Sequence, residues 1–495
     1  MNQELVIYNS LTGKKEVFKP IVEGKVGMYV CGPTVYGDPH LGNTRPVITF
    51  DVVSRYLRHI GNEVTYVRNI TDVGHLENDA DDGEDKIGKK AREEKVEPIE
   101  IARHYTAVYH DVTGKLNALP PDIEPRATDH IQEQIEMVQQ IIKNGYAYEV
   151  NGSVYFDLEK YYKNGNDYGK LSGRVVEDML AGSRELDGQD EKRSALDFAL
   201  WKKASPSHIM RWPSPWSDGY PGWHLECSAM STKYLGKQFD IHGGGMDLKF
   251  PHHEAEIAQC KACDHSTPVN YWMHNNMITI NGQKMGKSLG NFITLQQLYD
   301  GNHELLERAY APMTIRFFVL QAHYRGTLDF SNEALQAAQK GFNKLINAYK
   351  ALQDLTYSGA EEVNQKQETN IINSSEACYK AINDDFNTAQ VIANLFNLSK
   401  TINAFNNGNF NTGVVTEHTF NLLKETFNTF VITILGLKEE MTTEEKVQIK
   451  KELEKYSTAK EEKNYDVVDQ LRAQFKERGL VIRDMKHKID WAYEE

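Results

Sequence analysis

The sequence has no hydrophobic run of the about 20 apolar residues that a membrane-spanning helix needs, although 40% of its residues are hydrophobic. The longest apolar candidate, 430–437, is interrupted by Thr433 and Gly436, so we expect it to lie in a core. The N-terminal residues have neither the basic region nor the apolar block of a secretory signal. We therefore expect neither a membrane span nor export.

Cysteine is scarce: the 495 residues include five, at positions 31, 227, 260, 263 and 378. They are too few and too scattered for a disulfide framework, which favours a cytoplasmic protein whose cysteines act as thiols, metal ligands or packing groups. Cys260 and Cys263 form a CxxC pair, but no second pair accompanies it. We interpret that pair as packing or incidental thiols.

Basic residues are in the minority, because 56 Lys and Arg face 70 Asp and Glu and leave a net charge of −14. Phosphate contacts require Lys and Arg, so this balance argues mildly against a nucleic-acid partner. Segments 86–95 and 461–495 are locally richer in basic residues, and one basic face would be enough for binding. The net charge therefore neither supports nor excludes a nucleic-acid partner.

Apolar periodicity near the N-terminus predicts a strand, a helix and a second strand. The strands are expected at 25–30 and 64–67, and the helix at 44–59, where apolar residues recur near the helical period. This order is a βαβ unit. The sequence thus predicts an α/β fold of Rossmann type, a parallel doubly wound sheet.

The length predicts roughly two to four domains. A helical stripe at 131–142 and a strand at 153–156 indicate an inserted module, and strand character returns at 239–245. The predicted divisions are 1–115 (first half of the α/β domain), 116–205 (inserted connective module), 206–292 (second half), 293–333 (linker), 334–436 (helical bundle) and 437–495 (small C-terminal domain).

An acidic segment, 77–85, interrupts the first half of the α/β domain. It resembles a calcium-binding loop, but placing Gly83 at the sixth position puts Ala80 third and Lys89 twelfth, where oxygen ligands are required. We therefore interpret it as a solvated loop.

Two motifs contain residues that are suited to binding phosphate groups. His40 and Gly42 follow the first strand and open a helix, whose N-terminal N–H groups suit phosphate oxygens. Lys284 and Lys287 stand in a polar, glycine-flanked stretch and can stabilise charge on a triphosphate. Alone, the first motif fits a capping turn equally well, and the second is more typical of an exposed basic loop. Their order around an α/β domain strengthens the phosphate interpretation of both.

Four further residues are of the types that bind zinc: Cys31, Cys227, His252 and Glu256. His252 and Glu256 are four residues apart, so they face the same way if that segment is helical. Spacing alone favours two buried cysteines and a polar helix face over a zinc site, because Cys31 and Cys227 are far apart in the chain, but both interpretations remain open.

The two phosphate motifs resemble the HIGH and KMSKS signatures of class I aminoacyl-tRNA synthetases. Asn43 replaces the second histidine of the first signature, and Gly286 replaces the first serine of the second. Over essentially the whole chain the sequence resembles the cysteinyl-tRNA synthetase family. The matching blocks are 31–36, 69–73, 222–230, 242–256 and 384–388.

This resemblance implies a catalytic α/β domain that activates L-cysteine with ATP and transfers it to tRNA(Cys). It implies stem contacts from 293–333, tRNA binding by 334–436 and anticodon binding by 437–495. It also implies one Zn²⁺ on Cys31, Cys227, His252 and Glu256, with Mg²⁺ accompanying ATP. We expect a monomer.

The resemblance also assigns the remaining site residues. The catalytic group comprises His40, Asn43, Lys284 and Lys287. The ATP and adenylate group comprises Gly32, Thr34, His40, Gly42, Thr71, Gly245, Asp247, Lys284, Lys287 and Ser288. The cysteine-binding group comprises Thr71 and Trp223.

A metal has a clear purpose in such an enzyme. Serine, alanine and cysteine differ too little in size for an apolar pocket to separate them, since a methylene contributes only about 1–3 kcal/mol. A soft metal ion favours a thiolate over a hydroxyl.

Two alternatives to a tRNA synthetase remain. One is a ligase that transfers cysteine to an amino sugar, which would need no anticodon-binding region, and the other is a non-catalytic RNA-binding homologue.

Overall fold

The structure, a computed structural model, describes residues 4–76, 85–176, 191–206, 208–485 and 488–495. The chain forms two compact units, one made of Val6–Gly114 with Leu119–Met277 and the other of Met1–Leu5, Lys115–Ala118 and Ile278–Glu495. The predicted acidic loop lies outside the described residues, except for Asp85.

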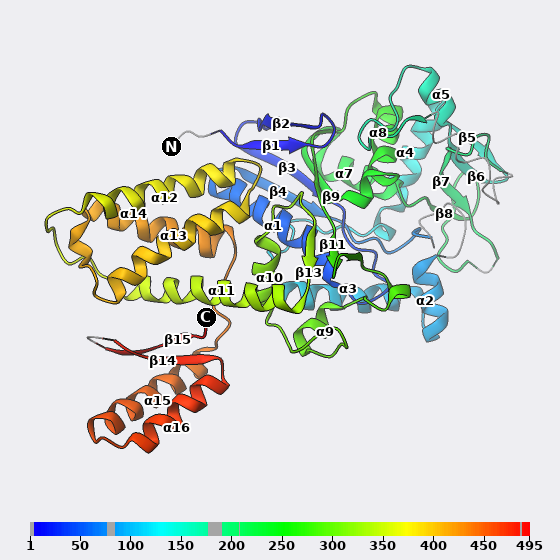
Figure 1. Cartoon of the computed structure of the whole chain (residues 1–495). Coiled ribbons are helices and arrows are strands. Elements are labelled where there is room, and N and C mark those ends of the chain that lie inside the picture. The colour runs from blue at the N-terminus through cyan, green and yellow to red at the C-terminus, as the bar shows by residue number, and fades with distance from the viewer. Residues whose placement is uncertain (1–3, 77–84, 177–190, 207, 486–487) are drawn as a thin grey trace. The chain divides into compact units, whose positions relative to one another are not determined.

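A four-stranded parallel sheet in the order β10-β9-β3-β4 forms the centre of the first unit (Figure 1). Its strands are β3 (Lys25–Val30), β4 (Glu63–Arg68), β9 (Phe239–Gly245) and β10 (Val269–Asn275). Helix α1 (Thr44–His59) connects β3 to β4, as the periodicity predicted. The predicted parallel α/β fold is confirmed.

Several helices and a hairpin complete the first unit. The helices are α2 (Lys86–Glu94), α3 (Pro98–Lys115), α4 (Ile131–Lys143), α5 (Leu158–Lys163), α7 (Leu225–Leu235) and α8 (His252–Asp264). Strands β1 (Val6–Asn9) and β2 (Lys14–Val17) form an antiparallel hairpin. Among the described residues, no helix is both long and apolar enough to cross a membrane.

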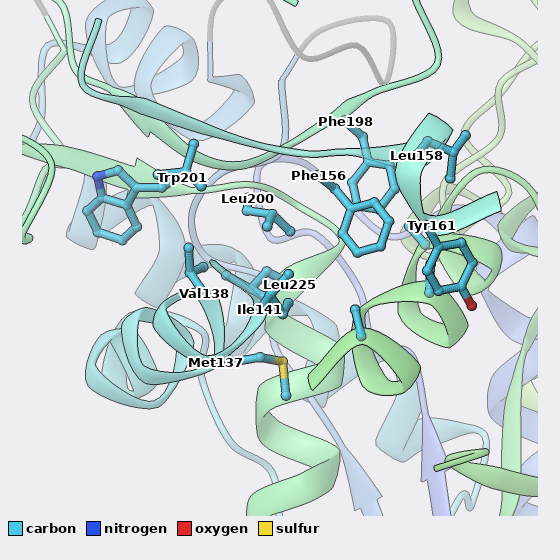
Figure 2. Packing of buried hydrophobic residues seen from close by; sticks show 14 of the residues in the cluster. Met137, Val138, Ile141, Phe156, Leu158, Tyr161, Phe198, Leu200, Trp201 and Leu225 are labelled. Atoms are coloured by element: carbon cyan, nitrogen blue, oxygen red, sulfur yellow. The ribbon is translucent and has the colours of Figure 1, made fainter. Parts of the chain in front are cut away.

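The inserted segment contains an antiparallel sheet in the order β5-β6-β7-β8. Its strands are β5 (Ala147–Val150), β6 (Ser153–Phe156), β7 (Phe198–Lys203) and β8 (Gly219–Pro221). Val138 and Ile141 of α4 pack beneath this sheet, where the rings of Phe156 and Phe198 stack with centroids 4.8 Å apart (Figure 2). Strand β8 lies beyond residue 205, the predicted end of the module.

The second unit begins with a three-stranded sheet, β12-β11-β13. Strand β11 (Ile278–Ile280) pairs antiparallel with β12 (Gln283–Lys284) and parallel with β13 (Leu328–Phe330). A 3₁₀ turn, η5 (Lys287–Leu289), and two short helices, α9 (Leu295–Asp300) and α10 (Pro312–Leu320), lie between β12 and β13 in the chain.

The rest of the second unit is mostly helical. It contains α11 (Asn332–Asp354), α12 (Gln365–Asn383), α13 (Thr388–Asn406), α14 (Glu417–Asn428), α15 (Thr443–Glu461) and α16 (Tyr465–Glu477). The apolar segment 430–437 lies largely in the core, as expected, with Phe430, Ile434 and Leu437 fully buried. The C-terminus forms a hairpin of β14 (Leu480–Asp484) and β15 (Ile489–Tyr493).

Candidate active site and metal centre

The carboxyl end of β3 and the first turns of α7 and α8 bring the four predicted zinc ligands together. Cys31 directly follows β3, Cys227 is in the first turn of α7, and His252 and Glu256 lie one turn apart on α8. One ligand atom from each of the four residues lies within 4.8 Å of all the others. Three of the four side chains are buried, and Cys31 is half-buried.

The spacing of the ligand atoms fits tetrahedral zinc. Zinc–sulfur bonds of ~2.3 Å at tetrahedral angles separate two sulfurs by about 3.8 Å, and bonds of ~2.0–2.1 Å separate nitrogen from oxygen by about 3.3 Å. The Sγ atoms of Cys31 and Cys227 are 3.7 Å apart. His252 Nε2 and Glu256 Oε1 are 3.3 Å apart. Cys31 Sγ and Glu256 Oε1, at 4.0 Å, are slightly farther apart than the ~3.6 Å of an ideal site.

A second set of residues, Cys31, His242, His253 and Glu256, meets the same distance criterion. His242 Nε2 lies 2.9 Å from Glu256 Oε2, the oxygen opposite the one beside His252. A histidine that holds the second oxygen of a metal-binding carboxylate fixes its orientation. The first set supplies two thiols, so we favour it as the ligand set, with His242 in support.

The electrostatics of the cluster agree with a metal site. Burial raises the pKa of the Cys31 thiol to about 11 and that of Cys227 well above its ordinary value. Burial also lowers the pKa of His253 well below its ordinary value, which keeps this imidazole neutral. Buried thiols in such surroundings ionise only with a compensating cation, and a coordinating metal ion provides it.

A buried hydrogen-bond network lies beside the cluster. The Gly32 N–H donates to Asn69 Oδ1 at 2.9 Å, Asn69 Nδ2 donates to Thr71 Oγ1 at 3.1 Å, and Thr71 Oγ1 donates to Glu226 Oε1 at 2.5 Å. A Cβ on residue 32 would lie 1.5 Å from the Asn69 carbonyl oxygen, so only glycine fits there. Burial raises the pKa of the Glu226 carboxyl well above its ordinary value.

His40 stands where the sequence predicted it, at the entrance to α1. The Gly42 N–H donates to His40 Nδ1 at 3.1 Å, and the His40 N–H donates to Asn43 Oδ1 at 2.9 Å. Because Nδ1 accepts a hydrogen bond, the neutral imidazole carries its proton on Nε2. Asn43, which replaces a histidine of the signature, thus holds the backbone of His40 in place.

The predicted lysine motif belongs to the second unit, whereas His40 belongs to the first. Lys284 ends β12, and Lys287 and Ser288 lie in η5, all three exposed. Asn291 fixes the backbone of the motif, because its Oδ1 accepts from the Gly286 N–H at 2.8 Å and its Nδ2 donates to the Lys284 carbonyl at 3.1 Å.

The remaining predicted residues lie in the first unit. The Trp223 ring stacks on that of His252, with centroids 4.6 Å apart. Thr34 pairs with Thr71 through a parallel β-bridge. Gly245 ends β9, and Asp247 is exposed in the 3₁₀ turn that follows.

Sequence reasoning missed several neighbours of the site: His75, His242, His253, Glu226 and Asn291. Three of them, Glu226, His242 and His253, lie inside blocks 222–230 and 242–256, which resemble the family. Closer attention to these blocks could have identified the three residues. Nothing in local spacing singled out His75 or Asn291.

Comparison with known proteins identifies the class. Residues 17–340 match the family described as tRNA synthetases class I (C) catalytic domain, and residues 377–439 match the DALR domain. Methionyl-tRNA synthetase from Mycobacterium tuberculosis shares the fold, with a TM-score of 0.56 at 14% identity over 83% of this chain and 89% of that one. A putative arginyl-tRNA synthetase from Campylobacter jejuni gives a TM-score of 0.53 at 13% identity over 84% of this chain and 94% of that one. The fold and the match define a class I tRNA synthetase.

Two curated relatives narrow the class. The protein from Cytophaga hutchinsonii named cysteine–tRNA ligase is 62% identical over 100% of this chain and 99% of its own length. The protein of the same name from Bacteroides thetaiotaomicron is 55% identical over 99% of both chains. The chain belongs to the cysteine–tRNA ligase family.

Proposed function

We propose that this chain activates L-cysteine with ATP and transfers the cysteinyl group from cysteinyl-adenylate to the 3′ end of tRNA(Cys). The choice of cysteine as the amino acid rests on the cluster of Cys31, Cys227, His252 and Glu256, whose ligand atoms all lie within 4.8 Å of one another. Full-length identity to cysteine–tRNA ligases supports the same reaction.

Cys31, Cys227, His252 and Glu256 would hold one Zn²⁺. Bound there, zinc would supply selectivity for a thiol over a hydroxyl, because thiolates are the softer ligands. His242 would keep the Glu256 carboxylate oriented through its contact with Oε2. Trp223, stacked on His252, would form a wall of the cysteine pocket.

The carboxylate of cysteine attacks the α-phosphorus of ATP in line, and diphosphate leaves. Such chemistry depends on positioning and on charge stabilisation. His40 would donate from Nε2 to a phosphate oxygen, Asn43 would hold His40, and Lys284 and Lys287 would stabilise the charge that develops on the triphosphate. Mg²⁺ would accompany ATP.

The other predicted contacts complete the adenylate pocket. Backbone at Gly32, Gly42 and Gly245 would allow the nucleotide to approach closely. The remaining contacts would come from Thr34, Thr71, Asp247 and Ser288.

The acceptor is tRNA. The helical bundle at 334–436, which includes most of the DALR match, and the segment 437–495 would bind it. A ligase that used an amino sugar would need neither region, so the full-length relationship to cysteine–tRNA ligases disfavours that alternative.

Aminoacylation of total tRNA with labelled amino acids tests this function. We expect labelled cysteine to become attached to tRNA in an ATP-dependent reaction, and labelled serine to remain free. Charging with serine at a comparable rate, or no charging by a zinc-loaded protein, would contradict the proposal.

A further inference from the structure

His75, which no motif identified, lies flat against Trp223. The two rings stack with centroids 4.0 Å apart and planes only 9° from parallel. Trp223 in turn stacks on His252, one of the four clustered ligands. His75 is buried and therefore supports the tryptophan ring from within the protein.

The imidazole of His75 is fixed at both nitrogens. Lys86 Nζ lies 2.7 Å from His75 Nε2, and Thr34 Oγ1 lies 2.6 Å from Nδ1. An ammonium group only donates, so Nε2 accepts and the proton of the neutral ring is on Nδ1, which donates to Thr34. The ring can neither rotate nor flip without losing one of these bonds.

The backbone around His75 is equally constrained. A Cβ on Gly74 would lie 2.5 Å from the Pro221 carbonyl oxygen, so this turn packs directly against the segment that carries Trp223. The Gly74 N–H donates to Asp85 Oδ2 at 2.9 Å, and the Lys86 N–H donates to the His75 carbonyl at 3.1 Å. Asp85 also caps α2. The start of α2 thus fixes the position of His75.

Selection of cysteine has a second requirement that a thiol-binding metal cannot meet. Homocysteine also carries a thiol, and it differs from cysteine by one methylene, which adds a C–C bond of about 1.5 Å. With its thiol anchored at the metal-ligand cluster, homocysteine carries its α-carboxylate away from the position that cysteine's occupies. A displacement of that order lowers a reaction rate by about 100-fold, provided that the pocket wall does not yield.

We propose that His75 is a specificity-determining positioning residue, which holds Trp223 rigid so that the pocket rejects thiols longer than cysteine. This inference rests on the proposed function. The stack supplies the rigidity, and the bonds to Lys86 and Thr34 prevent the imidazole from moving with the tryptophan.

The test compares L-cysteine with L-homocysteine in the full-length protein. ATP–diphosphate exchange gives kcat/KM for each amino acid, and calorimetry gives the Kd of each without ATP. The variants are His75→Ala, His75→Leu, His75→Phe, Lys86→Met and, as a matched control, His110→Ala, which removes an exposed histidine paired with Glu124. Zinc content is measured for every preparation.

We expect His75→Ala to raise the Kd and KM of cysteine with a smaller effect on kcat. The preference for cysteine over homocysteine should fall about 10-fold, which is within the range that one methylene produces in a binding pocket. His75→Phe retains an aromatic ring and should restore most of the preference. Lys86→Met should lower it slightly, and His110→Ala should leave it unchanged.

A wild-type preference in the folded His75→Ala protein would overturn the proposal, and so would loss of zinc from that variant, because His75 is proposed to act through Trp223 and not through the ligands. Should His75→Ala not fold, a wild-type preference in a folded His75→Leu protein would overturn it, because Leu fills a similar volume but removes both the aromatic face and the hydrogen bonds of the imidazole. Absence of cysteine-dependent exchange in the wild-type protein would instead refute the proposed function.

Discussion

Cys227 and Cys263 lie on α7 and α8, two helices that are in contact, but they differ in what surrounds them. Cys227 lies in the ligand cluster, whereas Cys263 lies near the end of α8, outside the cluster. We expect the purified protein to contain about one zinc per chain, Cys227→Ser to lose most of it, and Cys263→Ser to retain it. Elemental analysis after dialysis measures this. Equal zinc in the two variants would place the metal elsewhere.

Lys350 on α11 is a half-buried lysine whose ammonium nitrogen is itself buried. Its Nζ lies 2.8 Å from the ring centroid of Trp491 on β15 and has no hydrogen-bond partner among the described residues. Burial lowers the pKa of Lys350 to about 8, although the carboxylates of Glu439 and Asp490 raise it. The desolvation of the ammonium therefore outweighs its attraction to the two carboxylates.

A pH dependence of stability follows for Lys350. The unfolded chain binds this proton more tightly than the folded protein, so the destabilisation is complete below about pH 8 and is relieved as the pH rises toward the ordinary lysine pKa of about 10.4. We expect Lys350→Met to raise the unfolding midpoint at pH 7 and to raise it less at pH 9.5. A lower midpoint than wild type at pH 7 would mean that the cation–π contact dominates.

At the residue scale, the sequence predicted the four clustered ligands only through a family resemblance. Cys31 and Cys227 are far apart in the chain, and only the fold brings them together. His75 and Asn291 were missed because their partners, Trp223 and the backbone of the lysine motif, are set by tertiary contacts and not by a local pattern.

At the element scale, the lysine motif is proposed to act on the rate of adenylation. Lys287 is exposed and its charge is proposed to act in the transition state. We therefore expect Lys287→Ala to lower the rate of adenylation and to leave the KM of cysteine nearly unchanged. Asn291→Ala, which frees the motif's backbone by removing two hydrogen bonds, should cause a smaller loss of the same kind.

Single-turnover adenylation with saturating and subsaturating cysteine separates these effects. The charge-retaining variant Lys287→Arg serves as the control. A higher KM for cysteine at an unchanged rate would make Lys287 a ground-state contact and refute its proposed role.

At the element scale, sequence periodicity was most informative where elements are long or fully buried. Strand β3 and helix α1 occur at the predicted residues because a parallel strand buried on both faces is continuously apolar and α1 has a helical apolar stripe. Strands β8 and β15 were missed. Strand β8 has only three residues, and both strands are defined by pairing with a partner strand.

At the scale of the whole molecule, we expect the C-terminal segment to bind tRNA and to take no part in cysteine activation. Residues 441–495 contain α15, α16 and the C-terminal hairpin, which contacts α11 through Asn347: its Nδ2 donates to the Tyr493 carbonyl and its Oδ1 accepts from the Tyr493 N–H, both at 2.9 Å. We expect their deletion to spare cysteine-dependent ATP–diphosphate exchange and to raise the apparent KM for tRNA strongly.

Circular dichroism must first show that the truncated protein is folded, because deletion exposes the face of α11 that carries Asn347. Binding of tRNA to the full-length protein should weaken as salt rises, since phosphate contacts release counterions, even though the net charge is −14. A folded truncated protein that charges tRNA as well as the full-length protein would show that 441–495 does not read tRNA.

We propose that Cys31, Cys227, His252 and Glu256 form a zinc centre that recognises the substrate thiol. X-ray absorption at the zinc edge of the full-length protein identifies the atoms bound to the metal. We predict two sulfur ligands at about 2.3 Å and two nitrogen or oxygen ligands at about 2.0–2.1 Å, with a third sulfur upon addition of L-cysteine and no change with L-serine. A spectrum without sulfur ligands, or one that L-cysteine does not alter, would contradict the account.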